Sequence, residues 1–578
     1  MIEGDNVNRN DCFSQWRQCY NESSMRKGLL AWYNFKKDSR ILEAYPQGGA
    51  LTGFLASKCR ELVCIIRSEN DRQSLEKRFA DMGNIKYKYI EEIEGAFDYI
   101  VAYDPFYYYE VSRNVTRRYK EWHGLLAPEG TLLLSVRNIF SPLSSLSAKN
   151  SINRGDDIVS LKKELGEQFS KTKSYYVYPD MVFPQEIYTD ECEPDRNIAY
   201  SVIPYSSELD NSHEYIWDFY RKAFDVMDIK NIAGAFLMEC TNAGEVDDAQ
   251  RIKITSDREN GMLTVIRKDK VEKAMYDDGQ TDSLKNIMSN HKKLKEAGIN
   301  AVELKMADGK IEMPIIKAPL LKDVLLKLDD SKALKLWERF FENIEKSSKE
   351  TECAKEWNEK YSEHNWGKIL KTGYIEMSPL NCFYDKGDLI FFDQEYTMEN
   401  CPMSFIVFRS IVHVYGDDSK SEVFETLKKR YGIDMLWDVY MRAELEFLGS
   451  ICKDKNKVIK DYFFSYNQYL YEKNQRMSVQ AIKYLFSDMG DKEIVCYGAG
   501  NGFKHFMNGY GRICKIAFVV DSNPQLVGKS VCGIQVKSPA QINPNQHRVI
   551  ITSRSIEEIK HKLISMNVED YRYLNRWE

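Results

Sequence analysis

Strand-like and helix-like segments alternate along the first 150 residues, and this alternation restricts the fold more than any other feature of the chain. Four short apolar runs are each bounded by turn residues or by charged helical stretches. They are Ser39–Glu43, Leu62–Ile66, Phe97–Ala102 and Thr131–Val136. Parallel strands need long connections that are usually helices, so this pattern predicts a doubly wound parallel sheet at the start of an α/β multidomain protein.

Composition limits the remaining possibilities. A chain of 578 residues is too long for one hydrophobic core, and 43% hydrophobic residues are typical of a globular protein. A net charge of −6 argues against a nucleic-acid partner. The sequence has no apolar run of 18 residues and no signal-peptide pattern, so we expect a cytoplasmic protein without a transmembrane segment. Thirteen scattered cysteines without a C-x-x-C pair favour reduced thiols over disulfides or a zinc site.

Two segments resemble class I S-adenosylmethionine-dependent methyltransferases. I41-L-E-A-Y-P-Q-G-G-A-L-T-G-F-L-A56 is similar to their first motif, and L125-L-A-P-E-G-T-L-L-L134 to their closing segment. The resemblance implies a Rossmann-like methyltransferase fold for residues 1–205. It also makes Gly48 and Gly49 the candidate cofactor-binding residues.

Other residues of this region argue against a working S-adenosylmethionine site. Tyr45 and Gln47 stand where the family has glycines that let the backbone approach the cofactor. Arg67 replaces the acid that accepts hydrogen bonds from the ribose hydroxyls, which a cation cannot do. Asp104, after the third strand, is a candidate contact for the adenine. The alternative is a domain that keeps the fold without binding the cofactor.

The stretch Y374-I-E-M-S-P-L-N-C-F-Y-D-K-G-D-L-I-F-F-D-Q-E395 has the layout of a protein-kinase phosphotransfer centre. Glu376 lies five residues before Asn381, and Asp393 follows the apolar strand Leu389–Phe392. The Asn381 and Asp393 oxygens are suitable ligands for Mg²⁺ against the phosphates of ATP. The Glu376 carboxylate is the candidate acceptor of a hydroxyl proton, although protein kinases have Asp there. The alternative is a surface hairpin with ordinary Asp and Asn turn residues.

Three further stretches resemble bacterial methyltransferase–kinase fusion proteins of surface-glycan clusters. They are S174-Y-Y-V-Y-P-D-M-V-F-P-Q-E-I-Y188, D393-Q-E-Y396 and P402-M-S-F-I-V-F-R-S-I-V-H413. The resemblance implies a surface-glycan or lipid-linked sugar as acceptor and glycan-assembly enzymes as partners. It also suggests that Arg409 is ion-paired inside the kinase-like domain.

The same resemblance implies a protein-kinase-like α+β fold for residues 206–455. Lys273 stands where the family has the lysine that pairs with the ATP phosphates, and Asp282 is the candidate ion-pair partner of Lys273. A glycine-rich phosphate loop is absent, and the hairpin Ser256–Gly261 is the only substitute. The alternative is that Lys273 is a solvated lysine in a lysine-rich stretch.

The sequence of residues 456–578 predicts a helical linker followed by a small Rossmann-like α/β domain. The segment E493-I-V-C-Y-G-A-G-N-G-F503 reads as a strand, a turn with Gly498 and Gly500, and a helix. Asp521 follows the next strand, where a ribose-binding acid belongs. The segment resembles nucleotide-binding domains appended to bacterial glycan enzymes, which implies a nucleotide or NAD(P) ligand. The alternative is an interaction module that binds no nucleotide.

Three functions therefore remain open. The first is an ATP- and Mg²⁺-dependent kinase that acts on a surface-polysaccharide intermediate. The second is a methyltransferase of a cell-surface glycan. The third is a catalytically inactive scaffold for glycan assembly. The Asn381/Asp393 pair favours the first hypothesis, and Gln47 and Arg67 argue against the second.

Overall fold

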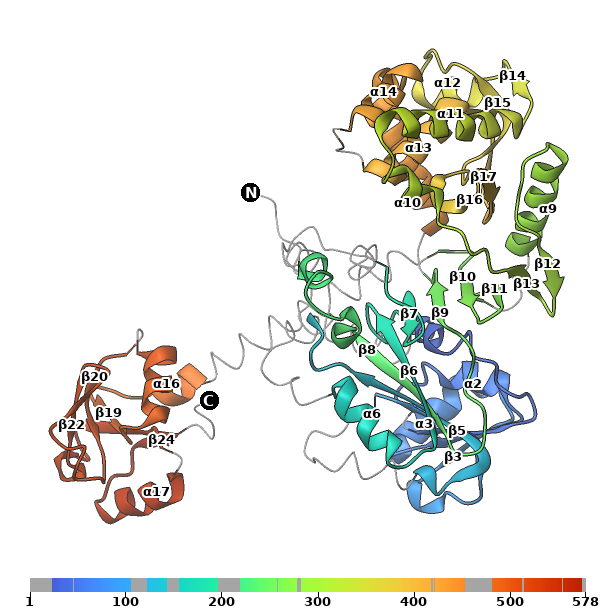
Figure 1. Ribbon diagram of the computed structural model, residues 1–578. Helices are drawn as coiled ribbons and strands as arrows, with labels where there is room; N and C mark the ends of the chain where they lie inside the picture. Colours follow the sequence, from blue (N-terminus) through green and yellow to red (C-terminus); the bar gives the residue numbers. More distant parts are fainter. Residues whose placement is uncertain are drawn as a thin grey trace. The chain divides into compact units, whose positions relative to one another are not determined.

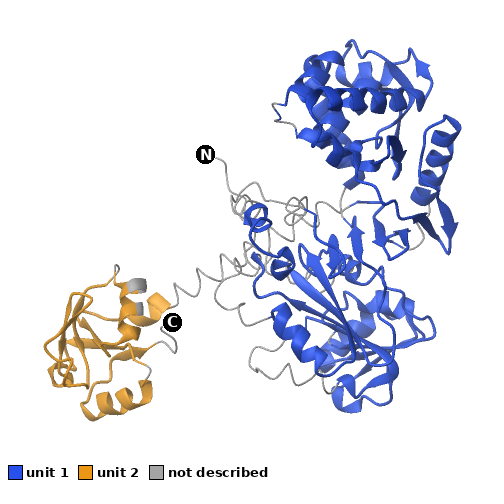
Figure 2. Ribbon diagram, viewed as in Figure 1, with its two compact units in different colours: residues 1–466 blue, residues 467–578 orange. Residues whose placement is uncertain are grey.

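The computed structural model forms two compact units, residues 1–466 and 467–578 (Figure 2). It describes residues 23–44, 46–104, 122–142, 155–195, 219–256, 258–277, 282–416, 419, 421–452, 481–511, 514–553 and 555–573. Tyr45 and most of the predicted helical stretch 461–487 lie outside the described residues. No helix among the described residues is both long enough and apolar enough to cross a membrane.

The first unit contains the predicted parallel sheet, in the order β5-β4-β1-β2-β3. Its strands are β1 (Arg40–Ala44), β2 (Glu61–Ile65), β3 (Ile85–Lys88), β4 (Phe97–Tyr103) and β5 (Leu126–Arg137), and each neighbouring pair is parallel. Helices α2 (Thr52–Lys58) and α3 (Glu69–Arg78) connect the first three strands (Figure 1). The doubly wound α/β prediction is confirmed, although β3 was missed because lysines alternate with its apolar residues.

The sheet continues beyond β5 through a strand from a later part of the chain. Strand β8 (Ala235–Thr241) lies antiparallel between β5 and β6 (Lys171–Tyr178), and helix α6 (Ile158–Gly166) contacts β6. All seven residues of β8 are buried, as expected for a strand covered on both faces. The division predicted at residue 205 therefore cuts this sheet, because β8 was assigned to the kinase-like part. The aromatic stretch 174–188 supplies β6 and β7 (Glu186–Thr189) and not a separate extension.

Neighbouring strands are antiparallel from β5 onward, and with the strands beyond β7 the sheet reaches thirteen strands. The added strands, in sheet order, are β9 (Arg251–Ile254), β10 (Met262–Ile266), β11 (Lys270–Met275), β13 (Lys310–Pro314) and β12 (Lys305–Ala307). Helix α9 (Asp282–Glu296) connects β11 to β12 and packs against β11. Its buried residues recur at three- and four-residue spacing, so one face of the helix covers the sheet.

A mostly helical lobe follows β13 (Figure 1). Its helices include α10 (Leu321–Leu325), α11 (Asp330–Lys346), α12 (Lys355–Tyr361), α13 (Met403–Tyr415) and α14 (Glu422–Arg430), and residues 433–452 are also helical. Its strands are β14 (Glu350–Thr351), β15 (Ile369–Tyr374), β16 (Cys382–Asp385), β17 (Asp388–Phe391) and β18 (Thr397–Pro402). A large aromatic core that includes Trp337, Phe340 and Phe405 holds these elements together. Arg409 is 6% exposed and pairs with Glu444 at 2.6 Å, which confirms its predicted ion pair.

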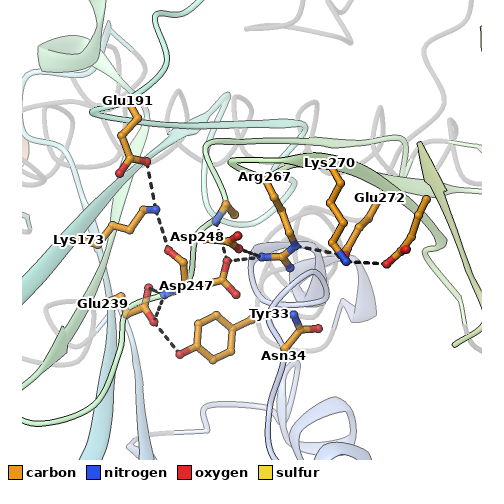
Figure 3. Close-up of polar contacts among 12 residues, drawn as sticks. Tyr33, Asn34, Lys173, Glu191, Glu239, Asp247, Asp248, Arg267, Lys270 and Glu272 are labelled. Atoms are coloured by element: carbon orange, nitrogen blue, oxygen red, sulfur yellow. Dashed lines mark hydrogen bonds and ion pairs between the residues drawn. The ribbon is translucent and has the colours of Figure 1, made fainter. Parts of the chain in front are cut away.

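Buried charged contacts join β8 to β10 and β11 (Figure 3). Arg267, the residue after β10, donates from Nη1 to Asp247 at 2.7 Å and from Nε to Glu272 at 3.0 Å. Glu239 on β8 is fully buried and accepts hydrogen bonds from the Tyr33 hydroxyl at 2.8 Å and the Asp247 N–H at 3.0 Å. One continuous polar network therefore links the two parts of the sheet.

The second unit contains a small, mostly parallel sheet. Its sheet has the order β21-β22-β20-β19-β23-β24, with all neighbouring pairs parallel except β21–β22. The strands are β19 (Glu493–Tyr497), β20 (Ile516–Val520), β21 (Ser530–Val531), β22 (Ile534–Lys537), β23 (His547–Ile551) and β24 (Tyr571–Tyr573). Its helices include α16 (Asn501–Tyr510) and α17 (Ile556–Ser565), and residues 481–486 are also helical. The chain winds outward from β19 in both directions, which is the Rossmann arrangement.

Candidate functional site

The first unit brings Lys273 and Asp393 together although 120 residues separate them in the chain. Lys273 lies on β11, is 5% exposed and forms an ion pair with Asp393 through Nζ and Oδ1. Asp393 follows β17 in a left-handed conformation, with φ of 57°. Burial alone would raise the pKa of Asp393, but Lys273 lowers it below its usual value. The Asp393 carboxylate is therefore ionised and faces the lysine.

Asn381 lies beside the start of this segment. The Phe392 N–H donates to the Asn381 carbonyl at 3.0 Å, and Asn381 Nδ2 donates to the Glu376 carbonyl at 3.2 Å. The buried Gln394 side chain donates to the same Glu376 carbonyl at 3.0 Å. Gln394 was not among the predicted site residues, because its role depends on a contact across 18 residues of sequence. These bonds hold the 376–381 loop against the residues around Asp393.

The Glu376 carboxylate makes a second set of contacts. Its Oε2 accepts hydrogen bonds from the backbone N–H of Glu395 at 2.6 Å and of Tyr396 at 2.9 Å. Burial and the nearby Asp393 raise the pKa of Glu376 to about 7. The side chain therefore fixes the turn after Asp393, a positioning role that the sequence did not predict.

Helix α9 does not supply the acidic partner that was predicted for Lys273. Asp282 pairs with Lys285 at 2.9 Å and its side chain is 91% exposed, so the predicted pair between Lys273 and Asp282 is wrong. Asp282 opens the helix, where its side chain reaches solvent. Further along, Asn290 donates to the Gln394 carbonyl at 3.0 Å, and His291 is buried with a pKa lowered to about 4 by burial. Helix α9 therefore contacts the segment after Asp393 through the Asn290 amide, and the acid that was expected to face Lys273 lies in solvent.

The donor set of this site suits a hard cation bound with a nucleotide. Asp393 and Asn381 offer a carboxylate and an amide, and oxygen donors are what Mg²⁺ prefers. Mg²⁺ usually keeps several waters and binds through one or two carboxylates together with substrate phosphates. The described residues contain no cluster of three His, Cys, Asp or Glu side chains able to hold a metal ion.

A buried arginine stands at the carboxyl ends of the parallel strands, where open α/β sheets bind ligands. Arg26 is 1% exposed, donates to Gln47 Oε1 at 2.9 Å and lies 4.0 Å above the ring of Tyr103, the last residue of β4. Gln47, in the turn after β1, has a φ of 58°, a conformation that glycine adopts more easily. The Arg26 and Gln47 side chains thus occupy space at the tips of β1 and β4.

The other candidate residues of this region have structural partners. Gly49 has a φ of 87°, and a Cβ there would lie 2.6 Å from the Phe79 ring, so ring packing by itself requires glycine. The Gly48 carbonyl accepts a hydrogen bond from Arg78. Asp104 is fully buried and pairs with Arg137 at 2.9 Å. Arg67, two residues after the end of β2, is exposed.

Glu43, near the end of β1, gives this sheet a pH dependence. It is 3% exposed and accepts a hydrogen bond from Thr52 at 2.7 Å. Burial raises its pKa from 4.5 to about 7, so the folded protein binds the extra proton between these values and loses stability as the pH rises through them. We expect the Glu43→Gln variant to lose this dependence, which amounts to at most about 3 kcal/mol. Urea unfolding at pH 5 and pH 8 measures it, and equal pH slopes in both proteins would contradict the assignment.

In the second unit the predicted residues gather at the end of β19. Gly498 has a φ of 109°, and a Cβ there would lie 2.8 Å from the Ser553 Cβ. Asp521 Oδ2 accepts a hydrogen bond from the Ala499 N–H at 2.8 Å, and its Oδ1 accepts one from the Asn523 N–H at 2.8 Å. Asp521 therefore holds the turn between Gly498 and Gly500, in addition to any contact with a ribose.

We expect Gly498→Ala to destabilise the second unit by roughly 1–3 kcal/mol, because the added methyl group meets Ser553 and the backbone must stay left-handed. Gly500→Ala is the matched control, since a Cβ at that position would meet nothing within 4 Å and the backbone there is extended. Hydrogen exchange of β19 and β23 reports the local stability. Equal exchange in the two variants would show that the turn tolerates the side chain.

Comparisons with known proteins give fold similarity only. No protein-family model matches the sequence, and no curated protein matches it. The N-methyltransferase NodS from Bradyrhizobium japonicum WM9 is 15% identical, and the match covers 42% of this chain and 99% of that one with a TM-score of 0.22. The plantazolicin methyltransferase BamL, solved with a desmethyl analogue and S-adenosylhomocysteine, is 11% identical over 40% of this chain and 90% of its own, with a TM-score of 0.26. Coclaurine N-methyltransferase is 12% identical over 37% and 68%, with a TM-score of 0.24.

Proposed function

We propose that this chain is a kinase-like phosphotransferase that uses ATP and Mg²⁺ and phosphorylates a hydroxyl of a bacterial surface-polysaccharide intermediate. The observation that carries the proposal is the buried ion pair between Lys273 on β11 and Asp393 after β17, beside Asn381. A lysine able to contact phosphates is thereby paired with a carboxylate able to bind Mg²⁺, and the Asn381 carbonyl is bonded to the N–H of the residue before that carboxylate. The acceptor class rests on the resemblance of the sequence to glycan-cluster fusion proteins.

Each residue has a separate task in this proposal. Lys273 contacts the phosphates, and Asp393 and Asn381 hold Mg²⁺, which when bound offsets phosphate charge and fixes its position. Glu376 uses Oε2 for the turn after Asp393, and Oε1 takes the proton of the acceptor hydroxyl. A carboxylate with a pKa of about 7 suits that transfer at neutral pH.

Calorimetric titration of the purified protein with ATP and Mg²⁺ tests the proposal, and saturable binding that EDTA weakens is the expected result. We expect Glu376→Gln to bind ATP and Mg²⁺ with little change, because the amide oxygen still accepts the two N–H groups. Phosphate transfer should fall by about 100-fold or more, since an amide takes no proton. Absence of nucleotide binding by the wild-type protein would exclude the kinase function and favour a scaffold.

A second candidate, methyl transfer from S-adenosylmethionine, rests on the strand order β3-β2-β1-β4-β5-β8-β6. In this part of the sheet only β8 is antiparallel to the others, which is the arrangement of class I methyltransferases. The Arg26–Gln47 contact argues against cofactor binding, so we expect no dissociation constant tighter than roughly millimolar, or about −4 kcal/mol. A micromolar value in a parallel titration would make methyl transfer the better supported function.

A further inference from the structure

Helix α13 carries polar side chains that bind the loop after β15. Arg409 Nη1 donates to the Ile375 carbonyl, and Ser410 Oγ donates to the Met377 carbonyl at 3.1 Å. Arg409 is 6% exposed and Ser410 is fully buried, so these hydrogen bonds are shielded from water. The backbone of the loop is therefore attached to the helix on both sides of Glu376.

Further along α13, His413 contacts a serine of the same loop. The Ser378 hydroxyl lies 3.1 Å from His413 Nδ1 and accepts a hydrogen bond from the Leu380 N–H at 3.3 Å. Burial lowers the pKa of His413 to about 4, so the ring is neutral at neutral pH and Nδ1 can accept the hydroxyl hydrogen of Ser378. Ser378 is 2% exposed, and its hydroxyl therefore depends on protein partners.

Ser378 also begins the turn that contains Asn381. A single 3₁₀ turn spans Pro379–Asn381, with Ser378 as its N-terminal cap, and the Asn381 N–H donates to the Ser378 carbonyl at 2.8 Å. At the end of this turn Asn381 Nδ2 donates to the Glu376 carbonyl at 3.2 Å. Because Nδ2 is a donor, Oδ1 is the side-chain atom of Asn381 that is able to bind a cation. The direction of this oxygen therefore depends on the turn that Ser378 caps.

We propose that Ser378 and His413 are positioning residues for Mg²⁺: His413 fixes the Ser378 hydroxyl, and Ser378 fixes the turn that directs Asn381. The inference rests on the proposed kinase function and adds the side chains that orient one ligand of the metal ion. Groups that hold metal ligands in place typically change metal affinity by roughly 10- to 100-fold when they are removed. Lys273 lies on β11 and not on this turn, so we expect its contact with the phosphates to survive the loss of either residue.

Titration with ATP, in Mg²⁺ and separately in EDTA, tests the inference in three variants: Ser378→Ala, His413→Leu and His413→Asn. The gain in ATP affinity on adding Mg²⁺ measures the contribution of the metal ion. We expect Ser378→Ala and His413→Leu to reduce this gain by roughly tenfold and to leave ATP binding in EDTA unchanged. His413→Asn should retain a gain close to that of the wild type, because its amide oxygen can accept the Ser378 hydroxyl in place of Nδ1.

Ser404→Ala is the matched control. Ser404 lies at the other end of α13, is 7% exposed, and hydrogen-bonds to the Trp366 carbonyl at 3.2 Å and to the Tyr440 hydroxyl at 2.6 Å. We expect this change to lower the melting temperature about as much as Ser378→Ala and to leave the effect of Mg²⁺ intact. Hydrogen exchange of the Asn381 N–H in the ligand-free protein gives a readout without metal. It should become faster in Ser378→Ala and His413→Leu, and stay unchanged in Ser404→Ala.

The outcomes separate this inference from the proposed function. If Mg²⁺ strengthens ATP binding to the wild type and to all variants by the same factor, Ser378 and His413 do not position Asn381, and the kinase function stands. Equal weakening of ATP binding in Mg²⁺ and in EDTA would mean a general loss of the fold, which also contradicts the inference. If the wild type binds no ATP, the kinase function falls and the inference falls with it.

Discussion

Replacing Arg267 with methionine is expected to destabilise the first unit by about 3–5 kcal/mol. Arg267 is 4% exposed and its guanidinium contacts Asp247, Asp248 and Glu272. Methionine preserves much of the side-chain volume, so the loss comes from carboxylates left in a buried network without their cation. The network joins β8 to β10 and β11, and its failure would loosen the sheet between its two parts (Figure 3). Urea unfolding, with hydrogen exchange of β8 and β10, measures the effect.

Arg430→Met is the matched control for this change. Arg430 pairs with Glu338 at 2.6 Å, but the two side chains are 42% and 50% exposed, so we expect a loss of no more than about 1 kcal/mol. The loss of stability at acid pH gives a second measure of this network. Lys270 and Arg267 lower the pKa of Glu272 to about 2 in spite of its burial, so its stabilisation is complete above pH 4.5 and is lost as the pH falls towards 2. Equal losses in the two arginine variants would contradict the buried network.

Replacing Asp393 with alanine is expected to weaken binding of ATP with Mg²⁺ by at least about 100-fold, or ~2.7 kcal/mol. The neutral Asn381 amide cannot hold the cation alone, because Mg²⁺ binds proteins chiefly through carboxylates. Asp393→Asn should show nearly the same loss, since it keeps the side-chain shape and removes the charge. Calorimetric titration with ATP and Mg²⁺ measures both.

The same variant should behave oppositely when Mg²⁺ is removed. Lys273 pairs with Asp393 in the ligand-free protein, so alanine at position 393 releases the lysine for the phosphates. In EDTA we therefore expect Asp393→Ala to bind ATP at least as tightly as the wild type. Asp385→Ala, at the far end of the β16–β17 hairpin, is the control and should change neither titration. A loss of equal size with and without Mg²⁺ would mean that Asp393 supports the fold and not the metal.

The sequence by itself determined the elements whose patterns are local. The strands β1, β2, β4 and β5 are short apolar runs between turns. An apolar run also forms β19, and the turn at Gly498 separates it from α16. The spacing of Asn381 and Asp393 around β17 is also set within a short stretch of chain, and the metal site inferred from it stays a prediction. In these segments the hydrophobic periodicity, the turn residues and the helix caps all favour the same secondary structure, so the local sequence is sufficient to predict it.

Only the tertiary structure decided the features that depend on distant parts of the chain. β8 lies between β5 and β6, where both strands bond to its backbone. The apolar pattern of β8 predicts a buried strand but does not identify these two neighbours. The partner of Lys273 is Asp393 and not Asp282, since the ion pair depends on how the helical lobe meets the antiparallel strands. Arg26 reaches the tips of β1 and β4 from a segment before the sheet begins. Side-chain contacts of this kind are set by packing across the fold, and a linear pattern does not contain them.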